Sequence, residues 1–228
     1  MSHLPRGDSR LLHYILPMPP ITLLNRIAKR TAHTIDRALA RYWPASAHAN
    51  APEALLTQHL AHHLMNDGFL TIPEVRYPDH STTERLDLLA ISPAADWYIA
   101  IETKLLNHAG QLDLLLSDIR RLRRFALVPD HLYALPSDLH DTPPAPTHAV
   151  GLAAGLLWVG KHERPFSLRA LWEANPDAPP ISDATRAELD ALSPSFLPLL
   201  TAFHAQTGRY ELALIAFDIP SPVASTSP

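Results

Sequence analysis

Two apolar segments separated by a short connection constrain the fold of this chain more strongly than any other part of it. Residues 84–91 and 97–104 are rich in Leu and Ile, and the connection between them contains Pro93. This pattern predicts two strands joined by a turn. A turn centred between residues 94 and 95 sets the register. The facing pairs are then Ile91 with Tyr98, Leu89 with Ala100, and Asp87 with Glu102.

Alternation along the paired strands assigns the side chains of this hairpin to two faces. One face is expected to carry Asp87, Glu102 and Lys104. Two carboxylates side by side repel each other, and a divalent cation between them turns that repulsion into attraction. The hairpin therefore suggests a metal site, with solvated strand-end acids as the alternative. The other face is expected to be core and holds Leu86, Leu88, Ala90, Ile99 and Ile101.

The triplet Glu102-Thr103-Lys104 ends the second apolar strand, and a helical segment beginning at Gln111 follows it. A Glu-x-Lys triplet alone is a weak motif, but its position after an apolar strand, opposite Asp87, makes it more specific. Residues 84–122 resemble the core of the PD-(D/E)xK nuclease superfamily, and a looser likeness extends over residues 52–159. The nearest Pro-Asp pair is Pro78-Asp79, in a polar turn. We prefer Asp87, which lies in an apolar strand.

The resemblance implies an α/β fold with a restriction-endonuclease-like core, a mixed β-sheet flanked by helices, and N- and C-terminal helical additions. It implies a metal-dependent nuclease that hydrolyses phosphodiester bonds, with DNA as the expected substrate. Mg²⁺ or Mn²⁺ would be held by Asp87, Glu102 and the carbonyl of Thr103. Catalytic roles fall to Asp87, Glu102 and Lys104, joined by Glu53 on a preceding helix and Gln111 on the following one.

Several alternatives stay open. Glu53 fits equally well as a first-turn acid favoured by the helix dipole. Lys104 could orient water or stabilise the transition state, and a general-base role would require a lowered pKa. A nuclease-like scaffold that no longer cuts, and instead binds nucleic acid or a protein, is the second functional hypothesis. A structural domain with surface ion pairs is the third. A homodimer would suit cleavage of both strands.

Composition excludes some classes of function. The absence of Cys rules out disulfides, cysteine-ligated zinc and thiol catalysis. A hydrophobic content of 46% and a charged content of 18% indicate a globular chain. The apolar piece at residues 11–24 is interrupted by prolines and is too short to span a bilayer, so we expect a cytoplasmic protein without a membrane partner. The net charge is -4, yet residues 1–50 carry seven Lys or Arg against two Asp or Glu.

The remaining sequence suggests three regions. Residues 1–50 form a basic helical extension, residues 51–219 the nuclease-like domain, and residues 220–228 a flexible tail. The basic residues of the first helix suggest either a solvated face or a phosphate-contacting one. His59 and His63 share a helix face but lack the Glu of a zinc hydrolase motif. Helices are predicted at 21–43, 53–66, 111–125, 166–174, 183–192 and 196–206, and strands at 69–77, 131–135, 150–159 (or a packed helix) and 210–219.

Overall fold

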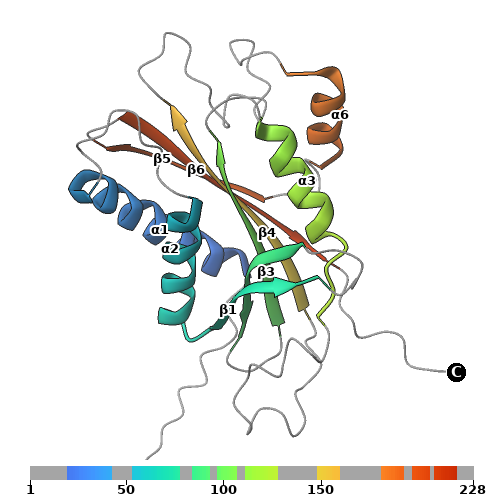
Figure 1. Ribbon diagram of the computed structural model, residues 1–228, viewed down its shortest axis with the longest axis horizontal. Helices are drawn as coiled ribbons and strands as arrows, with labels where there is room; N and C mark the ends of the chain where they lie inside the picture. Colours follow the sequence, from blue (N-terminus) through green and yellow to red (C-terminus); the bar gives the residue numbers. More distant parts are fainter. Residues whose placement is uncertain are drawn as a thin grey trace, which may run out of the picture.

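The computed structural model describes residues 20–42, 53–77, 84–92, 97–106, 111–127, 148–159, 181–192, 197–205 and 208–219. It shows an α/β protein in which helices cover both faces of a mixed, open sheet (Figure 1). The strand order is β1-β2-β3-β4-β6-β5, with β3 and β4 parallel and the other neighbours antiparallel. The strands are β1 (Leu70–Arg76), β2 (Arg85–Ile91), β3 (Trp97–Leu106), β4 (His148–Val159), β5 (Leu197–Ala205) and β6 (Gly208–Asp218).

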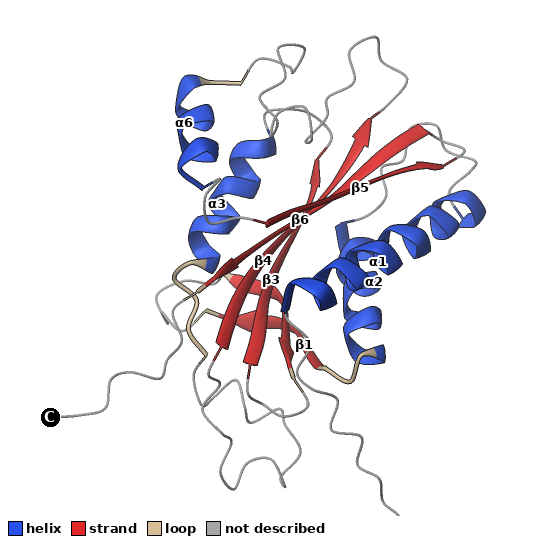
Figure 2. Ribbon diagram, turned by 180° about the vertical axis from the view of Figure 1, so that it is seen from behind, coloured by secondary structure: helices blue, strands red, loops and turns tan. Residues whose placement is uncertain are grey.

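Helices α1 (Pro20–Tyr42) and α2 (Glu53–Asn66) cover one face of the sheet (Figure 2). Both were predicted from the spacing of their apolar residues. Gly68, at a φ of 88°, ends α2 in the left-handed conformation that glycine adopts without strain. The Phe69 N–H then donates to the Leu64 carbonyl over 3.0 Å. The apolar stripe of α1 packs into the same core as α2 and this face of the sheet, through Leu23, Leu24, Ile27, Ile35 and Leu39.

Helices α3 (Leu112–Leu122) and α6 (Asp183–Leu192) lie on the opposite face (Figure 1). Helix α3 follows β3 and precedes β4, and such an intervening element is needed to join two parallel strands. Ser182 caps α6, since its Oγ accepts the Thr185 N–H at 3.0 Å. The inward apolar residues of α3 are Leu112, Leu115, Leu116, Ile119 and Leu122.

The register of the β2–β3 hairpin is confirmed, because Ile91 pairs with Tyr98 and Leu89 with Ala100. Both faces of the hairpin are buried, so the expected division into one polar and one apolar face was too simple. Leu86 packs with Leu89 on the α3 side, and its assignment to the face of Leu88 was wrong. Alternation is interrupted at Asp87, which lies beside Glu74 of β1, a residue with a φ of 55°.

The apolar segment at 150–159 is strand β4 rather than the alternative packed helix. Two of its glycines explain why small residues are needed there. A Cβ on Gly151 would lie 2.5 Å from the ring of Phe217, and one on Gly155 would lie 2.9 Å from Leu106 Cδ1. The glycines therefore leave room for side chains of neighbouring strands to cross β4.

The helix predicted at 196–206 is wrong: these residues form strand β5. β5 pairs with β6 along its whole length, from Leu197–Ala216 to Ala205–Gly208. It is the edge strand of the sheet, a position that tolerates Pro198. The expected C-terminal helical addition is therefore α6 alone among the described residues.

Some predicted features lie outside the described residues: the strand at 131–135, the helix at 166–174, the pair Pro78-Asp79 and the tail at 220–228. Within the described ranges, no helix has the length and apolar character required to cross a bilayer.

Candidate active site

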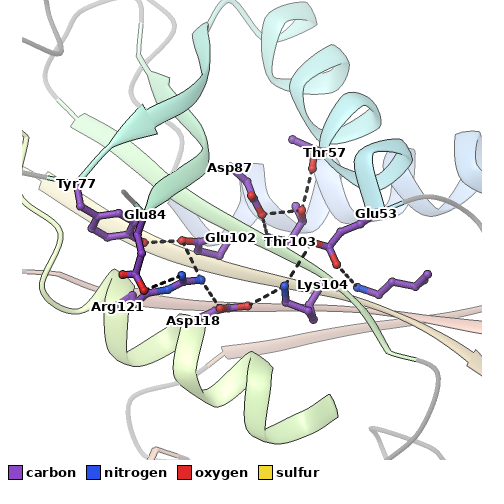
Figure 3. Close-up of polar contacts among 11 residues, drawn as sticks. Glu53, Thr57, Tyr77, Glu84, Asp87, Glu102, Thr103, Lys104, Asp118 and Arg121 are labelled. Carbon is purple, nitrogen blue, oxygen red and sulfur yellow. Dashed lines mark hydrogen bonds and ion pairs between the residues drawn. The ribbon is translucent and has the colours of Figure 1, made fainter. Parts of the chain in front are cut away.

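The candidate site lies where β2 and β3 separate, between α2 on one face of the sheet and α3 on the other (Figure 3). The paired ladder of the two strands ends at Leu88 and Ile101. Asp87 therefore does not pair with Glu102 across the ladder, as the extended register predicted. Its carboxylate instead accepts the backbone N–H of Thr103 at 2.7 Å. The separation of the strands leaves room for side chains from four elements to meet.

Asp87 is half-buried and is held by Thr103 alone among the described residues. Its Oδ2 accepts both the Thr103 N–H and the Thr103 hydroxyl, the latter at 2.8 Å. The Thr103 hydroxyl also lies 2.8 Å from the hydroxyl of Thr57 on α2. One carboxylate oxygen of Asp87 is thus fully engaged, and Oδ1 makes no hydrogen bond within the part of the chain that the structure describes.

Glu102 is almost completely buried, with 2% of its surface exposed. Its Oε1 accepts the phenolic O–H of Tyr77 at 2.6 Å and lies 3.5 Å from a guanidinium nitrogen of Arg121. Burial raises the pKa of Glu102 to about 8, and the Asp87 carboxylate adds to this, while the Tyr77 hydrogen bond and Arg121 act in the opposite direction. A neighbouring cation stabilises the ionised form of a buried acid of this kind.

Lys104 lies between two acids from the two flanking helices. Its Nζ is 3.3 Å from Glu53 Oε1 on α2 and 3.7 Å from Asp118 Oδ2 on α3. Burial favours a lower pKa for Lys104, but Asp118 and Glu53 outweigh burial and hold the pKa above its usual value. The ammonium is therefore protonated at neutral pH, which argues against the general-base alternative.

Glu53 lies beside Lys104, and its role in a catalytic site stays a prediction. It is the first residue of α2, so a first-turn acid and a site residue turn out to be compatible readings. Its Oε2 accepts the backbone N–H of Leu105 at 3.2 Å, and its Oε1 faces Lys104. This side chain joins the start of α2 to the far half of β3.

Asp118 and Arg121, one turn apart on α3, complete the cluster. The two side chains form an ion pair, and their contact with the site was not predicted from the sequence. Arg121 also lies 3.8 Å from Glu84, and Asp118 Oδ2 is buried with no hydrogen-bond partner among the residues that the structure describes. Burial raises the pKa of Asp118, although Lys104 and Arg121 oppose the rise. Only the spacing on α3 could have signalled these two residues.

Tyr77 and Thr57 were also missed. Tyr77 follows β1, and its contact with Glu102 depends on the register of three strands. Thr57 lies four residues after Glu53, so the helical repeat places both on one side of α2. That spacing was visible in the sequence, but it did not indicate which strand the side chain meets.

The other candidates from the sequence are Gln111, His63 and the basic residues of α1. Gln111 takes the N-cap position of α3, and its role stays a prediction. His63 lies 3.1 Å from the hydroxyl of Thr34, and burial lowers the His63 pKa. On α1, Arg26 and Arg30 pair with Asp67 at 3.1 and 3.2 Å, and the two alternatives for that basic helix stay open.

The fit of a metal rests on two side chains. Among the described residues, no three His, Asp or Glu side chains are arranged to hold an ion. Mg²⁺ commonly uses only one or two carboxylates, with water and substrate phosphate completing its shell. Asp87 Oδ1 and the buried Glu102 would be such a pair of oxygen ligands, with the Thr103 carbonyl as the third that the sequence suggested. No protein-family model, curated protein or solved structure matches the chain.

Proposed function

We propose that this protein is a metal-dependent nuclease of the PD-(D/E)xK type that hydrolyses phosphodiester bonds, with DNA as the substrate to test first. The observation that carries the proposal is the convergence of Asp87, Glu102 and Lys104 where β2 and β3 separate, with Glu53 reaching them from α2 (Figure 3). The mixed sheet flanked by helices supports it, because the resemblance implies that architecture.

Asp87 and Glu102 are the residues proposed to hold Mg²⁺ or Mn²⁺. The bound ion would lower the pKa of a water molecule and offset charge on the phosphate. Lys104, kept protonated by Glu53 and Asp118, would stabilise negative charge on the phosphate oxygens in the transition state. Glu53 would orient that ammonium through their 3.3 Å contact.

A second candidate, a scaffold that binds nucleic acid without cutting it, is favoured by one observation. Arg121 already places a positive charge 3.5 Å from Glu102 Oε1, and Tyr77 donates to the same oxygen. In that arrangement Glu102 is part of a closed structural network, and no cation is required for its burial.

Cleavage assays separate the two candidates. Supercoiled plasmid and single-stranded DNA would be incubated with the full chain in Mg²⁺, Mn²⁺ or EDTA. A nuclease cuts in the metals and not in EDTA, and Glu102→Ala and Lys104→Ala both remove cleavage while circular dichroism stays unchanged. The matched control is Glu188→Ala, which loses only a surface ion pair with Arg120. DNA binding without cleavage by the wild-type chain would instead support the scaffold.

A further inference from the structure

The residues that hold Asp87 form a chain of hydroxyl groups that begins on α2. Thr103 donates its hydroxyl proton to Asp87 Oδ2 at 2.8 Å, and the hydroxyl of Thr57 lies 2.8 Å from that of Thr103. A hydroxyl carries one proton. Because Thr103 donates its own proton to Asp87, Thr57 must be the donor in the contact between the two threonines.

The Thr57 proton is available for this contact. A threonine within a helix commonly donates to the carbonyl four residues earlier, which here belongs to Glu53. The Thr57 hydroxyl instead contacts the hydroxyl of Thr103 on β3. Thr103 is buried, with 1% of its surface exposed. A buried hydroxyl requires partners, and here both its donor and its acceptor capacity are used.

The chain of hydroxyls also distinguishes the two oxygens of Asp87. Oδ2 receives two hydrogen bonds from Thr103, one from the backbone and one from the side chain. Those bonds fix the plane of the carboxylate, and Oδ1 then remains as the oxygen that can bind a ligand. Groups that orient a metal-binding side chain in this way raise its affinity for the metal.

We propose that Thr57 and Thr103 are positioning residues that hold Asp87 with Oδ1 presented to the divalent cation. The inference rests on the proposed function, since it assumes that Asp87 is a metal ligand. It assigns to the Thr103 side chain a role separate from that of its backbone carbonyl, and it makes α2 a support for both Lys104, through Glu53, and Asp87, through Thr57.

Calorimetric titration of the full chain with Mn²⁺ tests the proposal. Thr103→Val keeps the backbone groups and the branched shape but removes the hydroxyl, and it should weaken Mn²⁺ binding about tenfold or more. Thr103→Ser restores the hydroxyl and should restore affinity. Thr57→Val should weaken binding less than Thr103→Val does. The control, Thr34→Val, alters a hydroxyl that contacts His63 on the α1 side and should leave affinity unchanged.

The double variant sharpens the test. Once Thr103 has lost its hydroxyl, Thr57 has no partner through which to act, so adding Thr57→Val to Thr103→Val should not weaken binding further. If Thr103→Val fails to fold, the Thr57→Val and Thr103→Ser titrations still decide. Wild-type Mn²⁺ affinity in Thr103→Val would overturn the positioning role and leave the proposed function standing. If Thr103→Val does not fold, wild-type affinity in Thr57→Val would have the same meaning. No Mn²⁺ binding by the wild-type chain would overturn both.

Discussion

The phenol of Tyr77 donates a hydrogen bond to Glu102 Oε1 over 2.6 Å, and both residues are buried. This bond links the end of β1 to the acid at the centre of the candidate site. It also favours the ionised form of Glu102, since it opposes the rise in pKa that burial causes. Tyr77 is therefore expected to matter for metal binding as well as for packing.

Tyr77→Phe should weaken Mn²⁺ binding about tenfold, because loss of a partner that orients a ligand typically has an effect of this size or more. It should also shift the pH dependence of binding to higher pH, because the ionised Glu102 loses a stabilising hydrogen bond and its pKa rises further. Tyr98→Phe is the matched control: Tyr98 is also buried and also packs edge-on against Phe125. Equal Mn²⁺ affinity in the two variants would contradict the role of Tyr77.

The stability of the metal-free protein should fall as pH rises through the window that Glu102 sets. In the folded chain Glu102 holds its proton up to about pH 8, whereas in the unfolded chain it ionises near 4.5. The folded state therefore binds more protons in this window, and one such group lowers stability by at most about 1.4 kcal/mol per pH unit. Urea unfolding in EDTA between pH 5 and 8 measures the slope.

Other groups titrate in the same window, so the comparison with Glu102→Gln is what isolates this residue. Burial raises the pKa of Asp118, which acts in the same direction as Glu102. The lowered pKa of His63 acts in the opposite direction near its usual value. The wild type should lose stability with rising pH relative to Glu102→Gln. Parallel curves would show that Glu102 is ionised in the folded chain throughout.

Mn²⁺ should stabilise the folded chain, and more strongly at pH 8.5 than at pH 6.5. A ligand at 100 times its Kd adds about 2.7 kcal/mol to the free energy of unfolding. Binding requires an ionised Glu102, so proton release accompanies it and acid weakens it. Thermal melting with Mn²⁺ and then with excess EDTA measures the effect and its reversal. An identical Mn²⁺ shift in Glu102→Gln would place the ion elsewhere.

Gly151→Ala should destabilise the fold by about 1–3 kcal/mol, as overpacking of a core usually does. The added methyl group would lie 2.5 Å from the Phe217 ring. Gly155→Ala is the milder counterpart, since its nearest neighbour is the flexible end of Leu106. Phe217→Leu should recover part of the loss in the Gly151→Ala background. Urea unfolding measures these three variants, and equal losses at the two glycines would contradict the steric explanation.

The sequence pattern predicted the structural features that depend on residues close together in the chain. The β2–β3 register followed from the turn position, and the bounds predicted for the second helix, 53–66, are those of α2. The segment 197–205 was misassigned because a short apolar run suits either a helix or a strand, and its pairing with β6 decides between them. Tyr77, Thr57 and Arg121 could not be assigned to the site, because their contacts require several strands and both helix layers to be in place.

Because the pairing of β2 and β3 ends at Leu88 and Ile101, Asp87 also has a structural role. By accepting the Thr103 N–H, its carboxylate replaces a bond that a continuing ladder would have supplied. Truncation to alanine would leave the buried Thr103 N–H without its acceptor, so absence of the proposed cleavage in Asp87→Ala would reflect lost architecture as much as lost chemistry. Asparagine, which keeps an acceptor oxygen and removes the charge, is the substitution that tells the two apart.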